Sequence, residues 1–259
     1  MILYLSCTGN TLWVAKQLAD RTGEKLVDVA SVVPGSPLRL HGNECLGFCF
    51  PVHGWRPPMY FREFIRNSLC IEMFNGKRPY TFALCTCGDT IGETMLYFEQ
   101  DLQSQGFMLD AKFDLRMPNT YVGLPFMNVD SKAVERQKLN DAPVEIKKIA
   151  EAINQRQKGD FTRLVGNWPR VNSRFLGSLF VKHVIGDKSF CVDKSNCMHC
   201  GKCVRCCPVK NIVMGVGGAP EWKHTGKCLS CFACYHHCPS HSITYGMMTR
   251  GKGQYTFKK

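Results

Sequence analysis

Acidic side chains are scarce in the last part of this sequence. Residues 161–259 contain only three Asp or Glu residues but 15 Lys or Arg residues, whereas residues 1–160 contain 18 of each kind. The whole formal net charge of +12 therefore belongs to the C-terminal part. Such an imbalance either compensates negative charge held within that part or attracts an acidic partner, and the sequence favours the two equally.

Long apolar runs are missing as well. No segment reaches the roughly 20 apolar residues that cross a bilayer, and residues 1–6 lack the basic stretch and cleavage site of a secretory signal. Sixteen cysteines without an export signal indicate a reducing compartment, because thiols stay reduced there. We therefore expect a cytoplasmic protein.

Several common binding patterns are also absent. The sequence has no Gly-x-Gly-x-x-Gly fingerprint and no Gly-Lys-[Ser/Thr] phosphate loop. No helix-turn-helix or zinc-finger pattern accompanies the basic C-terminal part, so nucleic acid is not the expected partner. No carboxylate pair or Ser-His-Asp set points to a substrate, and we predict no catalytic residue.

One cysteine motif occurs twice between residues 197 and 239. Each copy has the form Cys-x2-Cys-x2-Cys-x3-Cys-Pro. The first copy contains Cys197, Cys200, Cys203 and Cys207, and the second contains Cys228, Cys231, Cys234 and Cys238. The residues after each proline repeat too, because Ile212 and Gly215 correspond to Ile243 and Gly246. One structural unit is therefore used twice.

Three thiols within seven residues can surround a four-iron cubane, and the fourth thiol must come from elsewhere. In this spacing the fourth cysteine of each copy ligates the cluster held by the other copy. We therefore predict two [4Fe–4S] clusters with crossed ligation. Cluster one takes Cys197, Cys200, Cys203 and Cys238, and cluster two takes Cys228, Cys231, Cys234 and Cys207.

Two alternatives account for the cysteines less well. Structural zinc sites usually use two short cysteine pairs a dozen or more residues apart, rather than three evenly spaced thiols followed by Cys-Pro. A disulfide framework belongs to an oxidising compartment. The motif resembles the bacterial two-[4Fe–4S] ferredoxins over residues 190–246, which implies a small α+β domain that carries electrons.

The N-terminal part opens with an apolar run at residues 1–6, which predicts a buried parallel strand. A polar loop follows, and then an apolar helical stripe that begins at Leu12. The loop contains Ser6, Cys7, Thr8, Gly9, Asn10 and Thr11. Backbone N–H groups and hydroxyls at the start of a helix can bind phosphate. The loop resembles the FMN-phosphate loop of flavodoxins; a plain capped helix after a strand is the alternative.

A second loop follows the third predicted strand at residues 45–50. It contains Pro51, Val52, His53, Gly54 and Trp55. Flavodoxin-like proteins place a loop here against the flavin ring, often with an aromatic side chain stacked on it. Trp55 is our candidate for that stacking, and the alternative is a Trp that packs on the protein's own surface.

A third loop follows the fourth predicted strand at residues 79–86. It contains Cys87, Gly88 and Asp89 and resembles the second ring-binding loop of flavodoxins, Gly-Asp-x-x-Gly. The Tyr usual after the second Gly is replaced by Glu93. Tyr121, which follows the fifth predicted strand at residues 107–116, is our candidate for the second stacking partner.

Strands alternate with helices up to residue 157, which predicts an α/β fold with a doubly wound, five-stranded parallel sheet in residues 1–160. All three loops would lie at the carboxyl edge of that sheet, where ligands bind. Residues 161–189 form a basic linker with an amphipathic helix, which we expect to pack between the domains in preference to lying on a membrane. Residues 190–259 form the two-cluster domain.

The whole chain resembles the fused flavodoxin-like and two-cluster ferredoxin proteins of anaerobic bacteria. The resemblance implies FMN, two [4Fe–4S] clusters, and electron transfer to a partner redox protein with an acidic docking surface. An FMN-dependent reductase of a small acceptor, fed by its own clusters, is the alternative.

Overall fold

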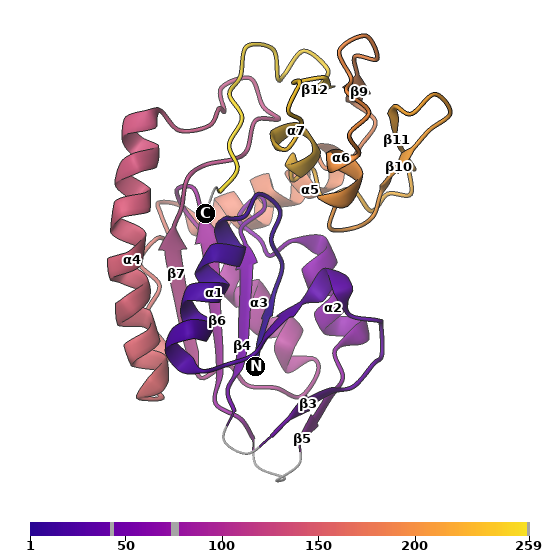
Figure 1. The fold of residues 1–259 in the computed structure, drawn as a ribbon. Helices are drawn as coiled ribbons and strands as arrows, with labels where there is room; N and C mark the ends of the chain where they lie inside the picture. The colour runs from indigo at the N-terminus through magenta and orange to yellow at the C-terminus, as the bar shows by residue number, and fades with distance from the viewer. Residues whose placement is uncertain (42–43, 74–77, 258–259) are drawn as a thin grey trace.

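A parallel β-sheet forms the centre of the N-terminal domain (Figure 1). The computed structural model describes residues 1–41, 44–73 and 78–257. The strand order is β2-β1-β4-β6-β7-β8, and all neighbouring strands are parallel. The strands are β1 (Ile2–Tyr4), β2 (Leu26–Asp28), β4 (Leu46–Pro51), β6 (Thr81–Cys87), β7 (Ala111–Arg116) and β8 (Gly159–Asp160). The five predicted strands are present, and the structure adds the short edge strand β8.

Helices cover both faces of this sheet. Helices α2 (Met59–Ser68) and α3 (Thr94–Gln103) pack on one face, where the buried rings of Phe48, Phe50 and Phe98 meet. Helices α1 (Asn10–Thr22) and α4 (Lys132–Asn154) pack on the other face. Strands buried on both faces must be apolar throughout, which is why they appear as continuous apolar runs in the sequence.

The order of the strands reverses between β1 and β4. From β1 the chain first adds β2 on one side and later adds β4, β6 and β7 on the other. At such a reversal the loops leaving the two central strands diverge and open a crevice at the carboxyl edge of the sheet. The loops that follow β1, β4, β6 and β7 therefore meet at one place, as the sequence predicts.

The C-terminal domain contains short elements only. Strands β9 (Phe190–Val192) and β12 (Ile243–Tyr245) pair antiparallel, as do β10 (Ile212–Met214) and β11 (Pro220–Trp222). Two one-turn helices, α6 (Lys202–Arg205) and α7 (Ala233–His236), occupy equivalent positions within the two motif copies. The first domain also contains η1 (Val29–Ser31) and the parallel pair β3 (Leu38–Leu40) and β5 (Ile71–Met73). In the described residues, no helix is long and apolar enough to cross a membrane.

The segment Thr249–Phe257, called here the C-terminal strap, returns from the cluster domain to the carboxyl edge of the sheet (Figure 1). The backbone N–H of Phe257 donates to the Thr8 carbonyl at 2.9 Å, and the Phe257 ring stacks on Trp13 with centroids 5.3 Å apart. The buried Tyr255 hydroxyl donates to Asn10 Oδ1 at 2.8 Å. The strap thus attaches the two domains to each other at the loop that follows β1.

His236 of α7 makes a second connection between the domains. Its Nε2 lies 2.7 Å from the Thr120 carbonyl, and its Nδ1 accepts the backbone N–H of Tyr255 at 3.2 Å. Because Nδ1 is an acceptor, the ring is neutral and Nε2–H is the donor. Burial lowers the pKa of His236 to about 4, so the ring keeps this form at neutral pH.

We expect Tyr255→Phe to destabilise the protein, because it leaves the buried Asn10 Oδ1 without its Tyr255 donor. The cost of such an unsatisfied acceptor is about 1–3 kcal/mol. Anaerobic urea denaturation of the cluster-loaded protein measures it. Tyr60→Phe is the control, because the half-buried Tyr60 hydroxyl forms no hydrogen bond within the described residues. An equal loss in both variants would contradict the role assigned to the strap.

Candidate functional site: a cavity between two domains

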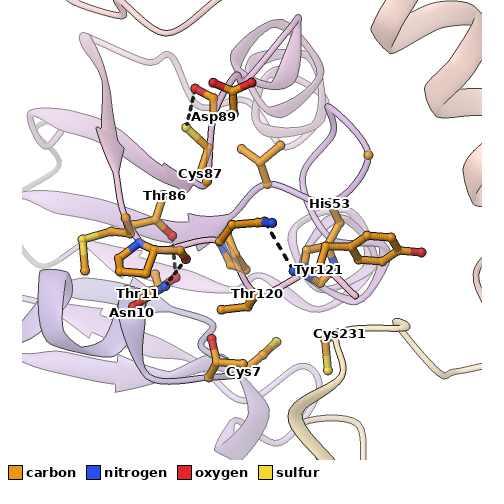
Figure 2. A pocket seen from close by; sticks show the side chains of 18 of the residues that line it. Cys7, Asn10, Thr11, His53, Thr86, Cys87, Asp89, Thr120, Tyr121 and Cys231 are labelled. Atoms are coloured by element: carbon orange, nitrogen blue, oxygen red, sulfur yellow. Dashed lines mark hydrogen bonds between the residues drawn. The ribbon is translucent and has the colours of Figure 1, made fainter. Parts of the chain in front are cut away.

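A cavity of about 240 Å³ lies at the carboxyl edge of the sheet, where the loops meet (Figure 2). The N-terminal domain lines it with residues from the loops after β1, β4, β6 and β7. The linker contributes Phe180, and the cluster domain contributes Leu229, Ser230 and Cys231. All predicted FMN-binding residues except Gly9 line this cavity. The cavity is therefore closed by parts of the chain far apart in the sequence.

The loop after β1 has the geometry of an anion site. Helix α1 begins at Asn10, and the Ser6 hydroxyl accepts the N–H of Leu12 at 3.1 Å. Gly9 adopts φ 101°, which an L-side chain rarely tolerates. Within the described residues, the N–H groups of Thr8, Gly9, Asn10 and Thr11 donate to no protein atom. These free donors at a helix N-terminus suit a phosphate group, with no Lys or Arg in the loop.

Two side chains of this loop are already engaged with the protein. Thr11 Oγ1 lies 2.8 Å from Thr86 Oγ1, so the two hydroxyls share a hydrogen bond between the loops after β1 and β6. Asn10 Nδ2 donates to the Pro118 carbonyl at 2.9 Å, and its Oδ1 accepts Tyr255. The Asn10 side chain therefore connects the loop after β1 to Pro118 and to the C-terminal strap. Only its backbone N–H is left to bind a ligand.

The two loops predicted to contact the ring are tied to each other. Trp55 has a left-handed backbone with φ 56°, and its Nε1 donates to Thr90 Oγ1 at 3.0 Å. Gly88 lies so close to Asn119 that a Cβ at this position would fall 2.9 Å from Asn119 Oδ1. Trp55 and Gly88 both line the cavity. A flat ring thus has an aromatic wall and a close backbone approach available to it.

His53 lies in the cavity wall and has no hydrogen-bond partner for its ring among the described residues. Burial lowers the pKa of His53 to about 4, so the imidazole is neutral near pH 7. A neutral imidazole offers one donor and one acceptor. His53 can therefore pair with the polar edge of a bound ring without adding charge.

Tyr121 lines the cavity, but its ring is held from both sides by other domains. Phe180 of the linker and Phe232 of the cluster domain each meet it edge to face, with centroids 5.4 Å away. The Tyr121 hydroxyl is buried without a partner, and burial raises the pKa of this group above its usual value. Tyr121 therefore supports the joint between the parts of the protein, and its role as a stacking partner stays a prediction.

The linker packs against the first domain through Ser173 and Ser178. The Arg56 guanidinium donates to the Ser173 carbonyl at 2.8 Å and to Ser178 Oγ at 2.5 Å. Helix α5 (Gly177–His183) carries Phe180 to the cavity. The apolar pattern of the linker predicts that Phe180 is buried, but it does not indicate which loops Phe180 covers.

The eight motif cysteines gather around two smaller cavities. Cys197, Cys200, Cys203 and Cys238 line one, and Cys207, Cys228, Cys231 and Cys234 line the other. These are the two crossed sets that the spacing predicts. Within the described residues, no three His, Cys, Asp or Glu side chains converge on a point that would hold a single metal ion. Four thiols around a cavity fit a cubane in each case.

The two sets differ in their surroundings. The cavity of cluster two is lined by Phe190, Trp222 and Phe232, and Cys234 is buried. The cavity of cluster one lies at the surface, where Cys200 and Met198 are exposed. Cys231 lines both the cluster-two cavity and the larger cavity at the sheet edge. Cluster two is therefore the inner site, and cluster one is the outer site.

Cys7 and Cys231 approach each other from the two domains (Figure 2). Both thiols line the cavity, and the proximity of the two sulfurs raises the pKa of Cys7 and lowers that of Cys231. Nothing in the sequence indicates this contact, because residues 7 and 231 belong to separate motifs.

Comparison with known proteins identifies a family for part of the chain. Residues 190–239 match the family described as 4Fe-4S dicluster domain, a stretch that includes all eight motif cysteines. No curated protein matches the chain.

Solved structures with similar folds share little sequence with it. General stress protein 14 of Treponema denticola, in complex with FMN, is 10% identical to this chain with a TM-score of 0.38. The match covers 59% of this chain and 97% of the Treponema protein. A flavodoxin from the domain Archaea is 12% identical with a TM-score of 0.34 and covers 58% and 96%. A flavone reductase is 14% identical with a TM-score of 0.35 and covers 93% and 85%.

The assignment of the first domain rests on its own strand order. Without the separate pair β3–β5, the order of the first five strands of the sheet is 2-1-3-4-5, which is that of flavodoxin. The chain therefore joins a flavodoxin-like α/β domain to a 4Fe-4S dicluster domain, as the sequence predicts.

We expect Cys7→Ala to lower the reduction potential of cluster two. The Cys7 thiol faces the cluster-two ligand Cys231 at the cavity wall, and its raised pKa keeps it protonated. A thiol that donates to a ligand sulfur favours the extra negative charge of a reduced cluster and so raises the potential. A tenfold change in the reduction equilibrium, about 59 mV for one electron, is the scale of the effect. Potentiometric titration followed by electron paramagnetic resonance measures it.

Cys87→Ala is the matched control, because Cys87 lines the same cavity but donates to the Asp89 carbonyl. The potential of cluster one provides an internal reference in both variants. Equal shifts of both clusters in Cys7→Ala would show a general effect of the substitution and would refute a specific contact.

Proposed function

We propose that this protein transfers electrons between FMN, two [4Fe–4S] clusters and a partner redox protein. The observation that carries the proposal is the shared wall: Cys231 belongs both to the cluster-two cavity and to the cavity formed by the flavin-type loops. A bound flavin and cluster two would be neighbours in this arrangement. Flavin exchanges one or two electrons and a cubane exchanges one, so the pair connects two-electron to one-electron chemistry.

The described residues divide the work of holding FMN. The free N–H groups of residues 8–11 and the hydroxyls of Ser6 and Thr8 suit the phosphate. Trp55 offers a face to the ring, and the neutral His53 offers a hydrogen bond at its edge. The buried Thr11–Thr86 pair keeps the phosphate loop and the ring loop in register.

The protein would conduct electrons in a defined order. The inner thiol set adjoins the flavin-type cavity, whereas the outer set reaches the surface at Cys200. The order is therefore flavin, cluster two, cluster one and partner, or its reverse. Lys202 lines the outer cavity and the exposed Arg205 donates to the Cys200 carbonyl, and these cations suit a partner with an acidic docking surface.

A reductase of a small acceptor is the second candidate. The observation that favours it is the apolar part of the cavity, where Leu124, Met127 and Phe180 lie beside the flavin-type loops. Apolar walls with a few polar groups are typical of small-molecule sites. Saturable turnover of a quinone-like acceptor, lost in Trp55→Ala, would distinguish this function from simple electron carriage.

Rapid mixing of the fully loaded protein with a limiting one-electron reductant tests the proposal. We expect the iron–sulfur absorbance to change first and the flavin to follow at a rate independent of protein concentration, because the transfer is internal. Cys234→Ser, which removes a cluster-two ligand, should slow the flavin phase by at least about tenfold, since it breaks the inner connection.

Cys70→Ser is the control, because Cys70 is exposed and lies outside both thiol sets. Iron, sulfide and FMN content is measured for each preparation before mixing. A loaded protein whose reduced clusters never reduce its flavin would overturn the proposal.

A further inference from the structure

The linker helix presents its large apolar side chains to the outside. It consists of the π-helical turn η2 (Val171–Leu176) followed directly by α5. Its buried positions are the small residues Ser173 and Gly177. Trp168, Phe175 and Leu179 are 75%, 62% and 43% exposed, and Val171 and Leu176 are exposed as well. These five residues are called here the outer stripe.

The helix cannot rotate to bury the outer stripe. A Cβ on Gly177 would lie 2.6 Å from the Gly54 carbonyl oxygen, so only glycine fits at this contact. Ser173 Oγ accepts the N–H of Glu93 at 2.8 Å, and the Ser173 carbonyl accepts the Arg56 guanidinium. These close contacts fix the face with Ser173 and Gly177 against the first domain. The outer stripe is therefore held on the opposite, outward face of the helix.

The segment that carries the outer stripe has charged residues of one sign only. Residues 161–186 contain Arg163, Arg170, Arg174 and Lys182 but no Asp or Glu. Arg170 and Lys182 are exposed, whereas Arg174 forms an ion pair with Glu93 at 2.7 Å. Five large apolar side chains flanked by cations are unusual for a free surface, because large exposed apolar patches mark interaction sites.

We propose that the outer stripe binds an anionic lipid membrane surface. Trp, Phe and Leu side chains enter the region between headgroups and acyl chains, and Arg and Lys beside them reach the lipid phosphates. The opposite charge of such a membrane complements the acid-free segment. A second copy of this chain would bring like charges together at the same face, which disfavours a dimer. The proposal is independent of the electron-transfer function.

The location of the outer stripe gives the docking a consequence. Phe180, on the same helix, lines the cavity at the sheet edge, and so does the exposed Met127 of the loop after β7. Docking through the stripe would bring this side of the cavity close to the lipid. The membrane would then face the carboxyl edge of the sheet, where the cavity lies, and not the opposite, amino edge.

Vesicle flotation of the full, cluster-loaded chain under anaerobic conditions tests the proposal. The probes are vesicles of phosphatidylcholine alone and of phosphatidylcholine with about one third phosphatidylglycerol. We expect the protein to float with the anionic vesicles, to float less with the neutral ones, and to release as salt is raised. The double variant Phe175→Ser with Leu179→Ser should lower the partition coefficient at least about tenfold.

Val216→Ser is the control, because Val216 is fully exposed in the turn between β10 and β11, away from the helix. It should leave flotation unchanged, and equal iron content in all variants shows that folding is retained. Flotation that is absent in the wild type, or unchanged in the double variant, overturns the proposal. A dimer in solution that the double variant converts to monomer, without vesicle binding, would instead make the stripe a contact between copies.

Discussion

The docking of the cluster domain on the carboxyl edge of the sheet, which places Cys7 and Cys231 in one cavity wall, is the constraint on which the rest of this protein depends. One thiol comes from the loop after the first strand of the sheet, and the other from the second copy of the cysteine motif. They meet at the wall of the cavity that the flavin-type loops enclose. If the cluster domain had docked elsewhere, the inner thiol set would face solvent or protein. The chain would then hold two unrelated redox sites.

Several weak interactions hold the cluster domain in this position. His236 reaches the Thr120 carbonyl, the Tyr255 hydroxyl reaches Asn10, and the Phe257 ring lies on Trp13. Each is worth a kcal/mol or so in isolation. Together they attach the loop after β1 and the loop after β7 to the cluster domain. Because Asn10 and Thr8 are in the anion-binding loop itself, the geometry of that loop depends on the cluster domain.

Local patterns in the sequence predicted the parts of the molecule but not their arrangement. Cysteine spacing separated the eight thiols into the two sets that the structure brings together, and the order of strand, loop and helix located the cavity. The sequence did not predict that Phe180 and Cys231 line the cavity or that the C-terminal strap contacts the loop after β1, because these roles depend on residues far apart in the sequence. The packing of Tyr121 was unpredictable for the same reason, since Phe180 and Phe232 contact its ring from distant parts of the sequence.

An iron-edge anomalous difference map from a crystal of the loaded protein would test the central claim most directly. The account predicts two compact iron peaks. One lies among Cys207, Cys228, Cys231 and Cys234, beside the Cys7 loop, with FMN density in the adjoining cavity. A peak ligated by all four cysteines of one motif copy, or an inner peak separated from the flavin by the body of the cluster domain, would contradict it.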